Sequence, residues 1–315
     1  MVKNTVSLKG NQKKPVLRLL GEYWKFKWLF LMLVPALVYL VVFKYMPMYG
    51  ASLAFKDYQI KAGIWNSPWV GMKYFNQLFA TRSFSTVLQN TFIISFYKLI
   101  FGFPMPILFA ILLNELKGNR FKKSVQTISY LPHFLSWVVL AGIFTQFFSP
   151  IGPFVQLFKK LGYPNLYVLT NPKYFRTFLI CTTIWKNIGW GSIVYLGALG
   201  GIDTELYDAA HVDGCNKLQR IWHVTLPGLT PVITIMLLLE IGRLLNDDFD
   251  QIFNLYNEAV WRVSDVISTY IYRTGLLGVN YSLATAAGLF KNVLALVLIL
   301  GANAITKKVN DYGLW

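Results

Sequence analysis

Several charged side chains lie inside strongly apolar stretches of this chain, where they could bind a polar solute or move an ion. Lys98 and Lys186 each interrupt such a stretch, and Glu240 and Arg243 lie three residues apart in another. An ionisable group within a bilayer is costly, so its default interpretation is functional. On a helix, Glu240 and Arg243 share a face and can instead neutralise each other as part of the packing. The sequence leaves both interpretations open.

The apolar stretches indicate a membrane protein. Of the 315 residues, 55% are hydrophobic and only 14% are charged, against about 25% charged in soluble globular domains. Several runs approach the ~20 apolar residues that a helix needs to cross a bilayer. We therefore predict an all-α, polytopic fold with one transmembrane domain at 26–306. A basic tail at 1–25 precedes it and a short tail at 307–315 follows.

Six apolar runs predict six transmembrane helices. They lie at about 26–45, 87–116, 124–148, 175–199, 229–246 and 286–306.

The distribution of basic residues predicts the orientation. The tail 1–25 and the loop 117–123 are densely basic for their length and lie on the same side as the loop 200–228. By the positive-inside rule this side is cytoplasmic, and six spans return both termini to it. The net charge of +16 therefore indicates contact with anionic membrane lipid, and no basic stripe on a soluble domain suggests nucleic acid.

The cytoplasmic loop is longer and better capped than a simple connector. Asp203 is suited to cap a helix, and Glu205 in the first turn complements its dipole. Gly214 is expected to end this helix, and a second short helix follows that Leu226-Pro227 stops at the membrane. This segment, residues 203–227, has the patterning of a docking element.

One face of the first helix is shallow. Leu206, Ala209 and Ala210 fall at positions i, i+3 and i+4, which share a helix face. Because two of the three side chains are single methyl groups, the backbone of a partner could approach closely there.

The spacing in this segment resembles the "EAA" loop of binding-protein-dependent ABC importer permeases. The pattern is Asp208-Ala-Ala, three residues, Gly214, nine residues, then Val224-x-Leu226-Pro227. The family has Glu-Ala-Ala, three residues, Gly, nine residues, then Ile-x-Leu-Pro. Five further stretches look like the LplB-type sugar permeases: Phe101-Gly-Phe-Pro104, Ser129-Tyr-Leu-Pro-His-Phe134, Trp185-Lys-Asn-Ile-Gly-Trp190, Phe249-Asp-Gln-Ile-Phe-Asn-Leu-Tyr256 and Gly313-Leu-Trp315.

The resemblance implies the type I permease fold and assigns the loop a role. It would be a coupling helix that docks on a cytoplasmic ATPase subunit, with Ala209 and Ala210 as the close-packing face and Gly214 as the bend. Asp208 stands where the family has glutamate, one methylene longer, so its contact with a basic group of the ATPase is expected to be weaker or rearranged.

The resemblance also implies the partners. They are a second homologous permease, two cytoplasmic ATPase subunits and an extracellular or periplasmic sugar-binding protein, at the bacterial cytoplasmic membrane. The chain has no G-x-x-x-x-G-K-[ST] phosphate loop, so ATP and Mg²⁺ are expected on the ATPase subunits and no cofactor on this chain. It is then a non-catalytic subunit.

The substrate path is implied by an offset from the loop. In maltose-type permeases the spans just before and after the loop contact the sugar. That offset implies Asn187 and Trp190, with Lys186 beside them, and Glu240, Arg243 and Asp247 on the other side. An amide and an aromatic ring suit the hydroxyls and the apolar face of an oligosaccharide. The excess of lysine and arginine over glutamate also suits an anionic one.

Two alternatives remain open. An ion-coupled secondary transporter would use Glu240 and Asp247 as coupling carboxylates, but it leaves segment 203–227 unexplained. An integral-membrane enzyme acting on lipid-linked sugars would need a clustered catalytic constellation near the interface, and none is visible in the sequence.

Overall fold

The computed structural model describes residues 26–116, 118–163, 166–245 and 249–310. Within these ranges the regular structure is helical, and the only extended pairing is an isolated bridge between Lys56 and Trp69. The all-α class is therefore confirmed. The chain divides into two compact units, one ending at Ser52 and one beginning at Leu53.

The first unit is built around a single apolar helix. Helix α2 (Lys27–Leu40) continues through a widened turn, η1 (Val41–Tyr45), into η2 (Met46–Phe55). All side chains of α2 and η1 are exposed within this chain. A helix that is apolar on every side suits lipid or another membrane-embedded protein.

The second unit is organised around α10 (Pro172–Leu199), the long helix that most other spans contact. Helices α5 (Arg82–Tyr97), η3 (Lys98–Gly102) and α6 (Pro104–Glu115) run on as one long apolar segment. The α6 end packs against α10 closely, since a Cβ on Gly191 would lie 3.0 Å from the ring of Pro106.

The third predicted span is bent, so the expectation of one straight helix at 124–148 is wrong. Helix α7 (Asn119–Tyr130) continues into η4 (Leu131–Phe134), where the run ends. Helix α8 (Trp137–Phe147) follows, with its axis at 100° to that run. Pro132 lacks an amide donor and disfavours continued helix. Ser136 then caps α8 by accepting the Val139 amide at 3.3 Å. We call residues 131–136 the elbow.

The span count agrees only roughly with six. Among the described residues four helices are long and apolar enough to cross a membrane, and the bent pair makes a fifth. The predicted span at 175–199 is α10, which is 28 residues long. It falls outside that group because Lys186 and neighbouring polar residues lower its apolar character. Lys186 is nearly buried, and polar residues that face a protein interior are tolerated at membrane depth.

A second expectation is also wrong, because Leu226-Pro227 does not stop the helix. Helix α12 (Lys217–Arg220), η5 (Ile221–Thr225) and α13 (Leu226–Gly242) form one continuous 26-residue run. The Leu226 amide donates to the Ile221 carbonyl, five residues back. This widened turn accommodates the missing amide and bulky ring of Pro227, as π-type turns do elsewhere in helices.

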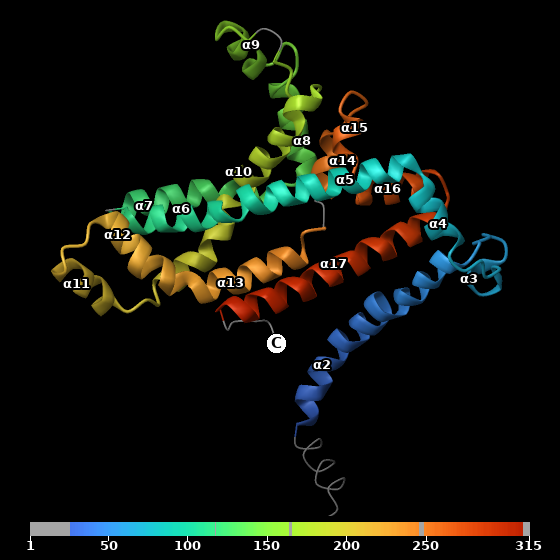
Figure 1. The fold of residues 1–315 in the computed structure, drawn as a ribbon, viewed down its shortest axis with the longest axis horizontal. Coiled ribbons are helices and arrows are strands. Elements are labelled where there is room, and N and C mark those ends of the chain that lie inside the picture. The colour runs from blue at the N-terminus through green and yellow to red at the C-terminus, as the bar shows by residue number, and fades with distance from the viewer. Residues whose placement is uncertain (1–25, 117, 164–165, 246–248, 311–315) are drawn as a thin grey trace, which may run out of the picture. The chain divides into compact units, whose positions relative to one another are not determined.

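The segments that join the predicted spans on the side opposite segment 203–227 form short helices within the described ranges. They are α3 (Gly63–Asn66), α4 (Lys73–Ala80), α9 (Pro153–Lys160), α14 (Phe249–Leu255), α15 (Trp261–Ser264), α16 (Ile267–Tyr272) and η6 (Arg273–Leu277). The last helix, α17 (Tyr281–Asn310), lies along α13 (Figure 1).

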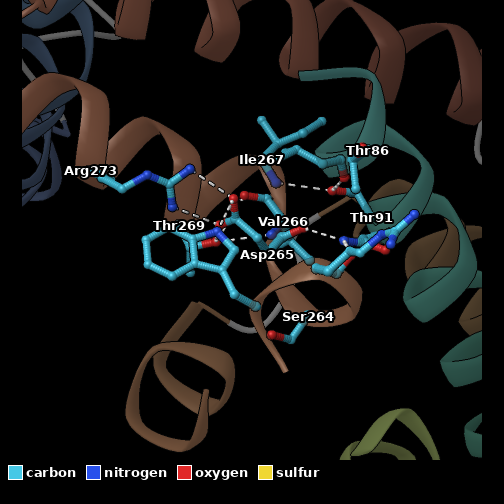
Figure 2. A network of polar contacts seen from close by, with 12 residues as sticks. Thr86, Thr91, Ser264, Asp265, Val266, Ile267, Thr269 and Arg273 are labelled. Carbon is cyan, nitrogen blue, oxygen red and sulfur yellow. Dashed lines mark hydrogen bonds and ion pairs between the residues drawn. The ribbon is translucent and has the colours of Figure 1, made fainter. Parts of the chain in front are cut away.

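The buried residue Asp265 organises the α15–α16 turn through its carboxylate and joins it to α5 through its backbone carbonyl (Figure 2). Asp265 receives both guanidinium nitrogens of Arg273, at 3.0 and 2.8 Å, the hydroxyl of Thr269 at 2.7 Å and the indole N–H of Trp261 at 3.1 Å. Its backbone carbonyl accepts from Asn90 of α5 at 3.0 Å. Because every oxygen of this buried group is bonded, its burial costs little and the turn holds one geometry.

Candidate substrate cavity and coupling segment

A cavity of about 730 Å³ lies between η3, α6, α10, α13 and the elbow. Four of the six predicted substrate-path residues line it: Asn187, Trp190, Glu240 and Arg243. Asp247 lies outside the described residues. Lys186 is not among the lining residues and points into the elbow instead. Lys98 and His133 line the cavity as well.

His133 builds one wall of the cavity together with α10. Its ring stacks on Trp190, with the ring centroids 4.8 Å apart and the planes 2° apart. Its Nδ1 lies 3.1 Å from Oδ1 of Asn187, and Phe134 meets the indole edge-on at 5.5 Å. The result is an aromatic surface with an amide at its side. Sequence reasoning did not assign His133, although it lies in the matched stretch Ser129 to Phe134.

Lys98 is held at the cavity by a buried glutamine. Its ammonium donates to Oε1 of Gln251 at 2.7 Å, and the hydroxyl of Thr183 donates to the same oxygen at 2.9 Å. The amide of Gln251 donates in turn to the Leu179 carbonyl at 2.8 Å. Thus α14 and α10 together fix the position of a cation at the cavity wall.

The end of α13 also lines the cavity. Glu240 occupies the last turn, and Arg243 caps the helix with its amide donating to the Glu240 carbonyl at 3.0 Å. Both line the same cavity, as their spacing on one helix face predicts. With Lys98, the cavity wall therefore carries two basic side chains and one carboxylate.

Lys186 is nearly buried, with 8% of its surface exposed. Its ammonium donates to the carbonyls of Pro132 at 3.2 Å, of His133 at 2.9 Å and of Leu135. Close to it, a Cβ on Gly189 would lie 2.2 Å from the Ser129 carbonyl oxygen. Helix α10 and the end of α7 therefore touch backbone to backbone.

The coupling segment, residues 203–227, begins with α11 (Thr204–Val212), whose start matches its prediction. The side chain of Asp203 accepts the Glu205 amide at 3.0 Å. Asp208 and Ala209 are exposed, whereas Ala210 is buried, so only part of the expected shallow face is available to a partner.

Gly214 ends α11 as expected. It has a φ of +73°, the left-handed conformation that favours glycine. The following amide, of Cys215, donates to the Ala210 carbonyl at 3.0 Å. The large apolar side chains exposed on the coupling segment are Leu206 and Val212 before this end and Leu218 and Trp222 after it.

A salt bridge that no sequence pattern indicated ties the coupling segment to α6. Arg220 reaches both carboxylate oxygens of Glu115, 105 positions earlier, at 3.0 and 2.9 Å. Its guanidinium also lies 5.9 Å from the ring centroid of Tyr207, whose hydroxyl is 3.2 Å from that of Thr225. The two helices of the segment are thereby joined to each other and to the end of a span.

A polar cavity between apolar helices, with an exposed helix, α11, outside the candidate spans, is typical of a transport pore subunit. The chain matches the family described as "binding-protein-dependent transport system inner membrane component" over residues 102–311 and belongs to it. Within the described residues no group of histidine, cysteine, aspartate and glutamate could hold a metal ion.

Two relatives from Bacillus subtilis (strain 168) match nearly the whole chain. "Protein LplB" is 41% identical over 290 residues, covering 92% of this chain and 91% of the relative. The "polygalacturonan/rhamnogalacturonan transport system permease protein YteP" is 38% identical over 308 residues, covering 98% and 95%.

Two solved structures share the fold. One is a bacterial ABC transporter involved in the import of the acidic polysaccharide alginate, with a TM-score of 0.87 and 40% identity, covering 93% of this chain and 99% of that chain. The other is a bacterial alginate ABC transporter in complex with an alginate pentasaccharide-bound periplasmic protein, again with a TM-score of 0.87 and 40% identity, covering 94% and 100%.

These relationships confirm the class expected from the loop motif. The chain is a membrane-embedded, non-catalytic permease subunit of an ABC importer with the type I permease fold. The secondary-transporter and membrane-enzyme alternatives are not supported.

Proposed function

We propose that this chain forms half of the translocation pore of an ATP-driven importer for acidic oligosaccharides. The observation that carries the proposal is the cavity wall, where Lys98 and Arg243 lie in the same cavity as the stacked pair His133–Trp190. The names of the relatives, which refer to polygalacturonan, rhamnogalacturonan and alginate, support the same substrate class.

The chemistry of the wall suits a uronate. A guanidinium such as that of Arg243 can donate two parallel hydrogen bonds to a carboxylate, and the ammonium of Lys98 adds a point charge. The face of Trp190 offers apolar area to a sugar ring, and Asn187 and Glu240 offer hydrogen-bond partners to hydroxyls. The cavity volume of about 730 Å³ falls within the ~300–1,000 Å³ typical of small-molecule sites, and a second permease would extend it.

Energy would enter through the coupling segment. The expected partners are a second permease, a sugar-binding protein and two ATPase subunits that bind ATP and Mg²⁺. The exposed Ala209 and the neighbouring Leu206 would face the ATPase cleft, with Asp208 at its edge. Segment 203–227 would then lie on the cytoplasmic side together with both chain termini, and the density of basic residues in the sequence supports this orientation.

The continuous run from Lys217 to Gly242 suggests how motion would reach the cavity. A 26-residue helical run spans about 39 Å, from the coupling segment at one end to Glu240 and Arg243 at the other. The Glu115–Arg220 salt bridge joins this helical run to α6. Displacement of the docked segment would then move two walls of the cavity together, which is the requirement of alternating access.

The test is reconstitution of the complete importer in liposomes with its binding protein. Uptake of trigalacturonate and of an alginate trimer is compared with uptake of methyl-esterified trigalacturonate, which has the same length but no charge. ATP-dependent uptake of an acidic trimer well above the ester is expected. Equal uptake of the acid and the ester, or uptake driven by an ion gradient without ATP, would contradict the proposal.

A further inference from the structure

The elbow gathers several backbone carbonyls at the bend between η4 and α8. The 100° bend interrupts the helix, so carbonyls at its end lack the amide donors that a further turn would supply. The Pro132 carbonyl keeps one amide donor, that of Leu135 at 3.2 Å. Unpaired carbonyls are costly in the interior of a membrane protein. They also form the negative end of the helix dipole. A cation is therefore the natural partner for this cluster.

Lys186 supplies that cation from within the chain. An ammonium has three hydrogens to donate, and here three carbonyls accept from it, those of Pro132, His133 and Leu135. The ammonium also lies 5.5 Å from the ring centroid of Trp137. No carboxylate in the described ranges forms an ion pair with it, so its charge is balanced by backbone dipoles.

The same elbow carries a wall of the cavity. The carbonyl of His133 is held by Lys186, while its side chain meets Asn187 and Trp190. Lys186 and Trp190 are one helical turn apart on α10. One short stretch of this helix therefore contacts both the backbone carbonyl and the ring of His133. The backbone contact at Gly189 leaves little room for the elbow to shift.

We propose that Lys186 is a positioning residue, a tethered cation that fills a carbonyl cage and thereby sets the orientation of His133 in the cavity. In other transporters with broken helices, carbonyls of this kind coordinate a free cation. Here the ammonium of Lys186 takes that place, so the elbow keeps its geometry without a dissociable ion. Only the transport readout of this inference rests on the proposed function.

Hydrogen exchange measured by mass spectrometry on the assembled, substrate-free importer tests the cage directly. Lys186→Met is expected to speed exchange of the amides in 131–136 on the order of tenfold or more, because charge-assisted hydrogen bonds to three carbonyls are lost. Lys173→Met, at an exposed lysine of the same helix, is the matched control and should leave the elbow unchanged. Unchanged elbow exchange in Lys186→Met overturns the proposal.

Chemical rescue separates the cage from a general packing effect. In Lys186→Ala, ammonium or methylammonium chloride is expected to restore protection of the elbow, whereas tetramethylammonium chloride at equal ionic strength is too large to enter. If the variant assembles poorly, its assembly with the ATPase subunits in the two salts gives the same comparison. Rescue that does not depend on the size of the cation overturns the proposal.

A transport measurement separates the role of Lys186 from the proposed substrate class. In Lys186→Met, the concentration of trigalacturonate-loaded binding protein that half-activates the ATPase should rise. If the elbow loosens and amines rescue it, but acidic and esterified trimers behave alike, the role of Lys186 stands and the proposed substrate class fails.

Discussion

The ring of His133 lies flat on the indole of Trp190, with 4.8 Å between the ring centroids and 2° between the planes. The contact joins the elbow to α10, the central helix of the second unit. Both rings line the cavity, and His133 lies next to Asn187 there. A bend in one span and the face of another thus produce a surface that neither has alone.

We expect Trp190→Ala to weaken activation by an acidic trimer about tenfold. The substitution removes an aromatic contact worth roughly 0.5–1.5 kcal/mol beyond its buried area. Substrate-stimulated ATPase activity of the reconstituted importer measures the effect. Trp190→Phe keeps a ring for His133 and for the sugar and should retain most of the activation. A phenylalanine variant as impaired as the alanine variant would argue against stacking.

Arg243→Gln should reduce uptake of trigalacturonate by about 10- to 100-fold, since a charge-assisted hydrogen bond contributes roughly 1.5–3 kcal/mol. Any residual uptake of the methyl ester should change much less. Arg120→Gln, at an exposed arginine of α7, is the control for loss of one positive charge. A parallel fall for acid and ester would show that Arg243 does not read the carboxylate.

Gly189→Ala should destabilise the unit by roughly 1–3 kcal/mol, the usual cost of overpacking. Its Cβ would lie 2.2 Å from the Ser129 carbonyl oxygen, so α7 and α10 must separate. Gly197→Ala lies in the same helix with no atom within 4 Å of the new carbon, and it should be neutral or stabilising by up to ~1 kcal/mol. Thermal unfolding of both variants in detergent provides the comparison, and equal melting temperatures would refute the close crossing.

Ala209→Asp should abolish assembly with the ATPase subunits while leaving membrane insertion intact. The residue is exposed on the coupling segment, so the change adds charge to the docking face and not to the core. Co-purification of the ATPase with the tagged permease measures assembly. Ser124→Asp, at an exposed site on α7, should not disturb it. Normal co-purification of the Ala209→Asp variant would remove this face from the interface.

Acid should destabilise the region around α4 through Asp57. The hydroxyl of Tyr74, at 2.5 Å, and then the ammonium of Lys73, at 3.1 Å, hold the pKa of this carboxyl below its ordinary value of 3.8. A depressed folded-state pKa gives stability that is present above the ordinary pKa and is lost as pH falls through the folded-state value. Melting temperatures measured down an acid series should fall less for Asp57→Asn than for the wild type, and identical slopes would contradict the linkage.

Much of this protein follows from local sequence alone. The apolar runs predict helical spans because a bilayer leaves the backbone few other ways to satisfy its polar groups. The caps at Asp203 and Gly214 are correct because capping depends on residues only a few positions apart. The offset from the loop also selected Asn187, Trp190, Glu240 and Arg243, which the structure brings to one cavity.

Features that depend on contacts between segments far apart in the sequence could be seen only in the tertiary structure. The continuation of α12 into α13 past Pro227, and the bend at the elbow, depend on how neighbouring helices accommodate a missing amide. The presence of a proline in the sequence therefore does not show whether the helix will continue through a widened turn or break. The role of Lys186 was likewise hidden, because an intramembrane ammonium can serve a solute or a set of carbonyls, and only the position of the elbow against α10 chose the carbonyls.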